Sequence, residues 1–473
     1  MQRFTFAIRH WAVVVTIAIS LCAMSNSVGV VAAPPDGADE LQHTRSAFSA
    51  DIMQDTMQET LAVYQRSDHR TPPCDAHVER VFDAYARRVA GATDRPSFTD
   101  VSIATYAAGQ AGCDDPMVVY VHAWALDNQR NLQGAGEFLL MAIEELEEAG
   151  YPIYMKASAE FRYADWLKAW RRGDESPAWR DKAERDLRRA LAAGEFDKAS
   201  PRRVYHFFRK FFTDANPVDL VERMAVMLMG WDGLDPWTKE MLLGDRERSL
   251  AWRARGHNYA VKVPEEAWPI FKRHMELAAN RYRAAYALAP ERPEAAAAMI
   301  VVENVSNLEE PEGADTWFER ATDAEFDWIE AYNAYLHWLR PRWGGSIDDM
   351  WDFAKFTLEG DRFDTDVPQM FITVARRVTL DTEDKQGVWI APDVYNTAMQ
   401  TLEKLATSPA QPKLEGWCRS LQAAIAWWAG RDNDLLKAVD ALGERLDRAA
   451  LWWLGTTYDK VMARASAARD PGF

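Results

Sequence analysis

The chain lacks the sequence patterns of the common hydrolytic and nucleotide-binding sites. Its 473 residues contain neither the zinc-protease pattern HExxH, nor the hydrolase pattern GxSxG, nor a phosphate-binding P-loop. We therefore expect no enzymatic activity, no cofactor and no metal. Asp232 and Asp235 form a pair of acids near Trp231, and glycosidase sites use such a pair of carboxyl groups. With 72 acidic residues in the chain, such pairs arise by chance, and turn and capping roles are favoured for both.

Basic residues are in deficit. Lysine and arginine number 55 against 72 acidic residues, which gives a net charge of −17. Because phosphate contacts require basic patches, this balance predicts that nucleic acid is not a partner. Beyond the N-terminal segment the sequence has no apolar run long enough to cross a bilayer, so we expect no stable membrane insertion.

The N-terminal segment has the anatomy of a secretory signal peptide. Arg3 and Arg9 form a basic start, an uncharged and mostly apolar run follows over Trp11–Met24, and small residues follow at Val30–Ala33. This order predicts cleavage after Ala32 and a periplasmic or secreted protein. An uncleaved membrane anchor is the alternative.

Sustained alternation of apolar and polar residues is also missing, so no strands are required and the segments are expected to be helical. Helix starts are marked by a capping side chain followed by proline at the first helical position. These starts are Asp115-Pro116, Ser176-Pro177, Ser200-Pro201 and Asp235-Pro236.

A small–large–small triplet recurs along the chain. It is found at Ala278, Tyr282 and Ala285, and again 36 positions later at Ala314, Phe318 and Ala321. This spacing is typical of the second helix of a tetratricopeptide hairpin. It predicts an all-α, tetratricopeptide-like helical-repeat solenoid, an α–α superhelix. Related triplets are Ala135-Leu139-Ala142, Ala183-Leu187-Ala190, Met350-Ala354-Thr357 and Leu435-Val439-Leu442.

The domain organisation follows from these signals. We expect a signal peptide over 1–32, a flexible leader over 33–45 and an N-terminal helical region with repeat-like hairpins over 46–195. An off-period helical segment follows over 196–264, and a C-terminal helical-repeat region over 265–473.

Three cysteines remain after the predicted cleavage. In an oxidising compartment Cys74 and Cys113 are the expected disulfide, since both lie in short segments that flank helices. Cys418 is expected to be a buried, inert thiol. Cys74 lies near His69 and His77, but no second cluster of metal ligands accompanies them, so a metal site is disfavoured.

Tryptophan is abundant, with 20 residues. At helical spacing most of them are expected to pack between helices, although a groove for sugars or peptides is the alternative. The sharpest local motif is the corner Pro341–Ser346. Its two glycines permit a left-handed turn and Ser346 caps the next helix. Trp343 is expected to plug the corner and Arg342 to contact helix-end carbonyls; ligand contact by both is the alternative.

Segments 251–256, 265–268, 339–346 and 350–354, with the helix around Ala278, resemble a family of uncharacterised bacterial proteins. That family carries a domain of unknown function with tetratricopeptide-like helices. The resemblance covers roughly residues 115–360 and implies a helical-repeat fold but no activity. Candidate ligand-binding residues are Arg342, Trp343, Trp252 and Arg255.

The function that we expect is an interaction scaffold that binds a protein or peptide partner on a concave face. One alternative is an α/α-toroid polysaccharide hydrolase or lyase. Another is a carbohydrate-binding helical-repeat protein.

Overall fold

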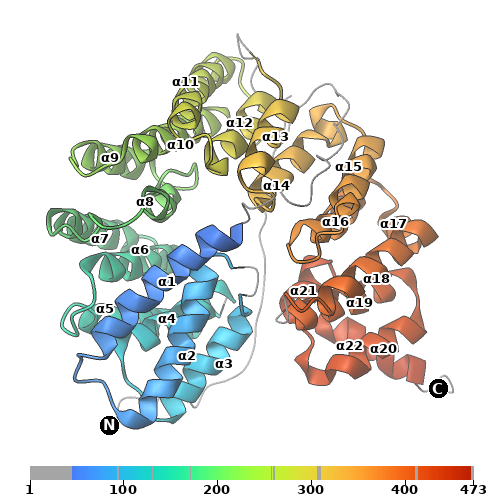
Figure 1. Ribbon diagram of the computed structural model, residues 1–473, viewed down its shortest axis with the longest axis horizontal. Coiled ribbons are helices and arrows are strands. Elements are labelled where there is room, and N and C mark those ends of the chain that lie inside the picture. The colour runs from blue at the N-terminus through green and yellow to red at the C-terminus, as the bar shows by residue number, and fades with distance from the viewer. Residues whose placement is uncertain are drawn as a thin grey trace. The chain divides into compact units, whose positions relative to one another are not determined.

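The computed structural model describes residues 45–469, except for 93–94, 130, 171, 257, 259–261, 306–310 and 411–413. The predicted signal peptide, and the predicted leader apart from its last residue, lie outside the described residues. The described part of the chain consists of α-helices, short 3-10 segments and turns, and it contains no strand (Figure 1). The predicted all-α helical-repeat fold is confirmed.

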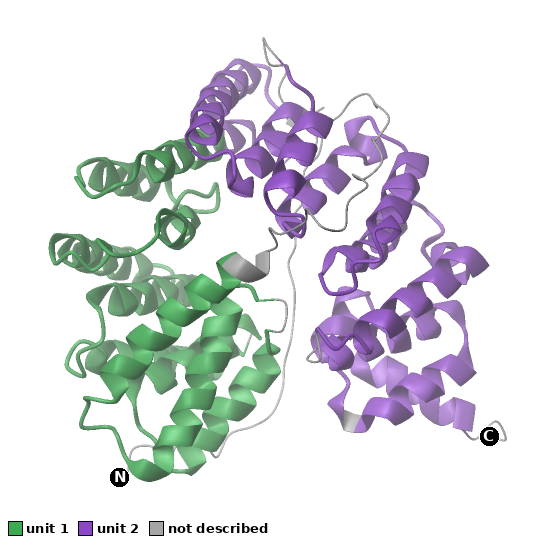
Figure 2. Cartoon of the chain, in the orientation of Figure 1, with its two compact units in different colours: residues 1–21, 46–250 green, residues 22–45, 251–473 purple. Residues whose placement is uncertain are grey.

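The chain divides into two compact units, residues 46–250 and residues 251–473 (Figure 2). The division falls inside helix α10. The predicted change of repeat period at residues 195 and 264 stays a prediction, because this division follows contacts and not the period of the sequence.

Unit 1 is built from helices that follow one another along the chain and pack as neighbours, with α4 against α5 and α6 against both α5 and α7. Its helices are α1 (Arg45–Tyr64), α2 (Pro72–Val89), α3 (Phe98–Gln110), α4 (Pro116–Asn128), α5 (Leu132–Glu145), α6 (Ile153–Ala169), α7 (Ser176–Ala192), α8 (Pro201–Phe208), α9 (Val218–Met229) and α10 (Pro236–Arg255). A 3-10 segment, η2 (Arg209–Phe211), extends α8.

Unit 2 repeats the same arrangement of sequential neighbours, with α12 against α13 and α19 against α20. Its helices are α11 (Ala267–Leu288), α12 (Pro293–Val305), α13 (Ala314–Ala324), α14 (Ile329–Trp338), α15 (Ile347–Glu359), α16 (Met370–Asp381), α17 (Lys385–Ile390), α18 (Pro392–Ala406), α19 (Glu415–Ala429), α20 (Asp432–Leu442), α21 (Arg448–Trp453) and α22 (Tyr458–Arg469). The 3-10 segments η4 (Pro341–Trp343), η5 (Val367–Gln369) and η7 (Gly443–Arg445) lie between them.

The small–large–small triplets are the packing faces of their helices. Ala278, Tyr282 and Ala285 of α11 have no solvent exposure, and the corresponding residues of α5, α7, α13, α15 and α20 are buried as well. Small side chains let two helix backbones approach, and the large residue between them fills the groove. The spacing in the sequence therefore marks the residues through which the helices contact one another.

Three of the four helix caps that were predicted from a capping residue followed by proline are confirmed. The side chain of Asp115 accepts hydrogen bonds from the N–H groups of Met117 and Val118, and Ser200 and Asp235 cap α8 and α10 in the same way. The fourth is wrong. Ser176 lies inside the first turn of α7 and its hydroxyl makes no hydrogen bond, because the helix begins one residue earlier than the proline signal indicates.

Cys74 and Cys113 form a disulfide with their Cα atoms 5.6 Å apart. It joins the first turn of α2 to the segment that precedes α4. Cys418 is a buried free thiol, and burial raises its pKa to about 12. The thiol is therefore neutral and unreactive at physiological pH.

Tryptophan side chains fill much of the core. Among the described residues, the buried ones are Trp166, Trp237, Trp317, Trp328, Trp338, Trp343 and Trp389. Most of the others are partly buried, and only Trp170 and Trp452 are more than two-fifths exposed. Within the described residues, none of the helices combines the length and the apolar character that a membrane span requires.

Candidate functional site

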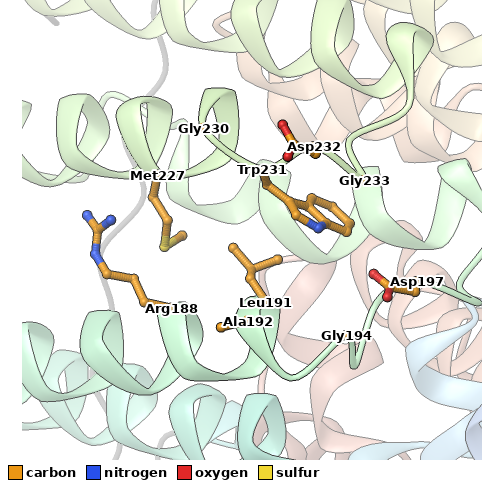
Figure 3. A pocket seen from close by; sticks show the side chains of 10 residues that line it. All are labelled: Arg188, Leu191, Ala192, Gly194, Asp197, Met227, Gly230, Trp231, Asp232 and Gly233. Carbon is orange, nitrogen blue, oxygen red and sulfur yellow. The ribbon is translucent and has the colours of Figure 1, made fainter.

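An open hollow in unit 1 lies between the turn that follows α7 and the turn that follows α9 (Figure 3). Its volume is about 720 Å³. The residues that line it are Arg188, Leu191, Ala192, Gly194, Asp197, Met227, Gly230, Trp231, Asp232 and Gly233. We call this hollow the Trp231 groove.

Glu195 fixes the first of the two turns. Its carboxylate oxygens accept hydrogen bonds from the backbone N–H groups of Ile153 and Tyr154, at 2.8 and 3.0 Å. These donors belong to the first turn of α6, where N–H groups have no acceptor within the helix and the helix dipole is positive. Gly194, with φ at 71°, lets the chain reverse directly after α7. The turn is therefore held against the neighbouring helix.

Trp231 is the central side chain of the groove. It is partly exposed, and its ring meets that of the buried Phe196 edge-on, with centroids 6.2 Å apart. A Cβ atom on Gly233 would come within 2.7 Å of the indole, so a glycine is required there for the ring to keep its position. Leu191, Ala192 and Met227 supply further apolar side chains to the lining.

Negative charge surrounds this apolar lining. Asp197 and Asp232 are exposed, and the C-termini of α7 and α9 both end at the groove with their partial negative charges. The cation of the lining, Arg188, is paired with Glu184 at 2.7 Å. The groove therefore offers an aromatic face, two carboxylates and two helix C-termini, a combination that favours a positively charged group.

Asp232 and Asp235 have different roles. The carboxylate of Asp235 accepts a hydrogen bond from the N–H of Thr238 at 3.1 Å and caps α10, as the sequence indicates. Asp232 lines the groove (Figure 3). Asp235 is not among the residues that line it.

The corner Pro341–Ser346 is held by internal contacts. Trp343 is buried, with its ring 4.7 Å from that of His337. Asp381, at the end of α16, accepts two hydrogen bonds from the buried Arg340, at 2.6 and 2.8 Å, and it also pairs with Arg342. Burial alone would raise the pKa of Asp381, yet the hydrogen bonds and charges of the two arginines hold it below its ordinary value. Arg342 therefore contacts a carboxylate and not the helix-end carbonyls expected from the sequence.

Arg255 is likewise buried. Its guanidinium carbon lies 5.3 Å from the ring centre of Trp252 and 5.5 Å from that of Trp268. It donates hydrogen bonds to the carbonyls of Gly256 and Asn258, at 3.0 and 3.2 Å. These contacts fix the chain at the end of α10. Ligand binding by the four residues predicted from the sequence stays a prediction.

Groups of metal ligands are not found within the described residues. Cys74 is held in the disulfide, and the Nδ1 atom of His69 lies 3.2 Å from Asp114. Of the three residues that lie close in sequence, His69 and Cys74 therefore have separate partners.

The sequence singles out half of the groove. Asp232 stands out because it and Asp235 flank the Gly233 turn, and Trp231 lies next to it. The other half, from Gly194 to Asp197, carries no local signal, because only the packing of α7 beside α9 brings the two turns together.

We compared the chain with protein families, curated proteins and solved structures. No family model matches the chain, and no curated protein does. The chain is similar to a solved structure described as a circular tandem repeat protein with novel repeat topology and enhanced subunit contact surfaces. The identity is 12%, the TM-score is 0.22, and the match covers 90% of this chain and 98% of the other. The resemblance of residues 115–360 to a bacterial family therefore stays a prediction.

Proposed function

We propose that the protein is an interaction scaffold that binds a basic peptide segment of a partner protein in the Trp231 groove. One observation carries the proposal: two helix C-termini and two exposed carboxylates surround a partly exposed indole. A lysine or arginine side chain matches all three features, since its cation is attracted to the ring face, the carboxylates and the helix ends. The net charge of −17 adds long-range attraction for a basic partner.

Export is part of this proposal. The basic start and apolar run of the N-terminal segment support a periplasmic or secreted location, and the Cys74–Cys113 disulfide is of a kind that persists in oxidising compartments. The partner would then be a protein of the same compartment.

The test is a binding measurement with two matched peptides. Fluorescein-labelled peptides of alternating lysine and alanine, and of alternating glutamate and alanine, are titrated with the protein and followed by fluorescence anisotropy. We expect the lysine peptide alone to bind, with an affinity that falls as salt is added. Equal binding of the two peptides would contradict the proposal.

Two variants locate the binding. Trp231→Ala should weaken binding of the lysine peptide by about 30-fold or more, as for a central aromatic anchor. Asp232→Asn should weaken it less and reduce its dependence on salt. Trp452→Ala in unit 2 removes another exposed tryptophan and should leave binding unchanged.

The carbohydrate alternatives are tested alongside. A glycan array and a screen for polysaccharide cleavage are run with the wild type and with Trp231→Ala. Glycan binding or turnover that depends on Trp231, without peptide binding, would replace the scaffold proposal by one of the two alternatives.

A further inference from the structure

Lys210 lies apart from the lining of the Trp231 groove, in η2 directly after α8. Its Nζ atom lies 4.1 Å from the ring centre of Phe207 and 5.1 Å from that of Phe211. The hydroxyl of Ser158, on α6, lies 3.5 Å from the same nitrogen. The ammonium group is thus held between aromatic rings and a single hydroxyl.

The cation that acts on the Lys210 amine, Arg162, is itself paired with an acid. It donates a hydrogen bond to Asp127 at 2.7 Å. Within the part of the chain that the structure describes, Lys210 is not within 4.0 Å of a carboxylate. In a chain with more acids than bases, an ammonium group left without such a partner is a position where an anion can bind.

Lys210 is solvent-exposed, but its amine lies close to other protein groups. The residue is exposed, yet the surrounding protein desolvates its amine and lowers the pKa to about 7. The positive charge of Arg162 lowers the pKa further. The charge of Asp165 raises it, but that carboxylate is already engaged by Arg180 at 2.6 Å. A ligand can therefore reach the amine, and a negative charge placed beside it would stabilise its protonated form.

We propose that Lys210 Nζ and Ser158 Oγ bind the carboxylate of a small ligand whose apolar part packs beside Phe207. A single ammonium with one hydroxyl matches the charge and the two oxygens of a carboxylate. A doubly charged phosphate would lack donors here. The partly exposed ring of Phe207 offers an apolar surface next to the charge. This site is independent of the proposed peptide groove.

The probe is N-acetylphenylalanine, and its amide is the matched control. In isothermal titration calorimetry of the full chain at pH 6, the acid should bind and the amide should not. Binding of the acid should weaken by about tenfold from pH 6 to pH 8, because the protonated fraction of an amine with a pKa near 7 falls from nine-tenths to one-tenth. At pH 8 the complex should take up a proton from the buffer.

Two lysine variants complete the experiment. Lys210→Met should weaken binding of the acid by about tenfold or more. Lys182→Met should not, because Lys182 also lies over an aromatic ring, that of Trp179, but is already paired with Glu160. A cooperative melting transition above the temperature of the titration would show that each variant is folded.

Three results would overturn the proposal: no binding of the acid, equal binding of the acid and the amide, or unchanged binding by Lys210→Met. A second measurement follows the Lys210 amine directly. After reductive ¹³C-methylation, the NMR signal assigned to Lys210 should titrate near pH 7 and shift to higher pH when the acid is added. A midpoint that does not respond to the acid would also overturn it.

Discussion

At the scale of single residues, the least expected group is the carboxyl of Glu160 in α6. It has no solvent exposure, and Lys182 Nζ lies 3.1 Å from one of its oxygens, although neither oxygen has a hydrogen-bond partner. Burial raises its pKa from the usual 4.5 to about 7, and the nearby ammonium group of Lys182 reverses only part of that rise. A carboxyl in this position is destabilising when it is charged.

Glu160→Gln should therefore change how stability depends on pH. The pKa of Glu160 is higher in the folded protein than in the unfolded chain. Its contribution to the free energy of unfolding is therefore complete below pH 4.5 and is lost as the pH rises through 7. The wild type should lose on the order of 3 kcal/mol through this group, and the glutamine variant should not. Thermal melting at pH 5 and pH 8 measures the difference.

Glu147→Gln is the control, because the pKa of Glu147 is shifted in the opposite direction to that of Glu160. Hydrogen bonds from Arg189 and Lys156 lower the pKa of Glu147 to about 2, so its contribution is present above pH 4.5 and is lost as the pH falls toward 2. This variant should be less stable than the wild type at neutral pH. If the melting temperatures of the two variants depended on pH in the same way, the explanation given for both carboxyls would be contradicted.

Trp343→Ala should lower stability by about 3–5 kcal/mol, as expected when a large buried side chain is deleted. The indole N–H makes no hydrogen bond, so the loss comes from packing alone. Melting temperature is the measurement, and Trp452→Ala, at a position 43% exposed, is the control that should have little effect. A melting temperature that stays constant in Trp343→Ala would instead favour the corner as a ligand site.

At this scale the sequence predicts which side chains are buried better than it predicts which charged side chains form ion pairs. Trp343 and Cys418 are buried as expected, because apolar residues at helical spacing leave a periodic pattern. The pair of Arg340 with Asp381 is not foreseeable, since 41 positions separate the two residues and only the folding of α16 against the corner joins them. The same holds for Glu160 and Lys182.

At the scale of elements, the corner between α14 and α15 depends on its glycines. Gly344 has φ at 99°, a conformation that favours glycine. A Cβ atom on Gly345 would lie 2.0 Å from the carbonyl oxygen of Leu339, which is backbone and cannot rotate away. The double glycine is therefore a steric requirement of the turn, as the sequence motif indicates.

Gly345→Ala should accordingly destabilise the protein by roughly 1–3 kcal/mol, because the corner must shift to make room. Gly416→Ala is a matched control. Gly416 lies in α19, and a Cβ atom there would meet nothing within 4 Å, so alanine should add about 0.5–1 kcal/mol of stability. Thermal melting of both variants is the test. Similar effects of the two substitutions would show that the close approach to Leu339 does not constrain the turn.

Element boundaries also show where sequence reasoning stops. Asp115, Ser200, Asp235 and Ser346 cap their helices because their side chains reach N–H groups of their own first turn, a local interaction. Ser176 has the same sequence signal and does not cap. Its helix begins one residue earlier than the proline signal indicates, so Ser176 is the first helical residue and not the cap.

At the scale of the whole molecule, the sequence indicates the kind of fold but not the position of the proposed binding surface. Small residues at offsets zero and seven, with a large residue at offset four, recur because helices pack in sequential pairs. The Trp231 groove arises from two turns that such packing brings side by side, and neither turn is unusual alone. Composition adds only the sign of the partner's charge.

The central claim is that a basic peptide binds between the turns that follow α7 and α9. Hydrogen–deuterium exchange followed by mass spectrometry, with and without the lysine–alanine peptide, tests it most directly. We expect slower exchange over residues 194–197 and 230–233 in the presence of the peptide, and no change there in Trp231→Ala. Protection confined to other segments, such as the corner Pro341–Ser346, with none at these two turns, would contradict the claim.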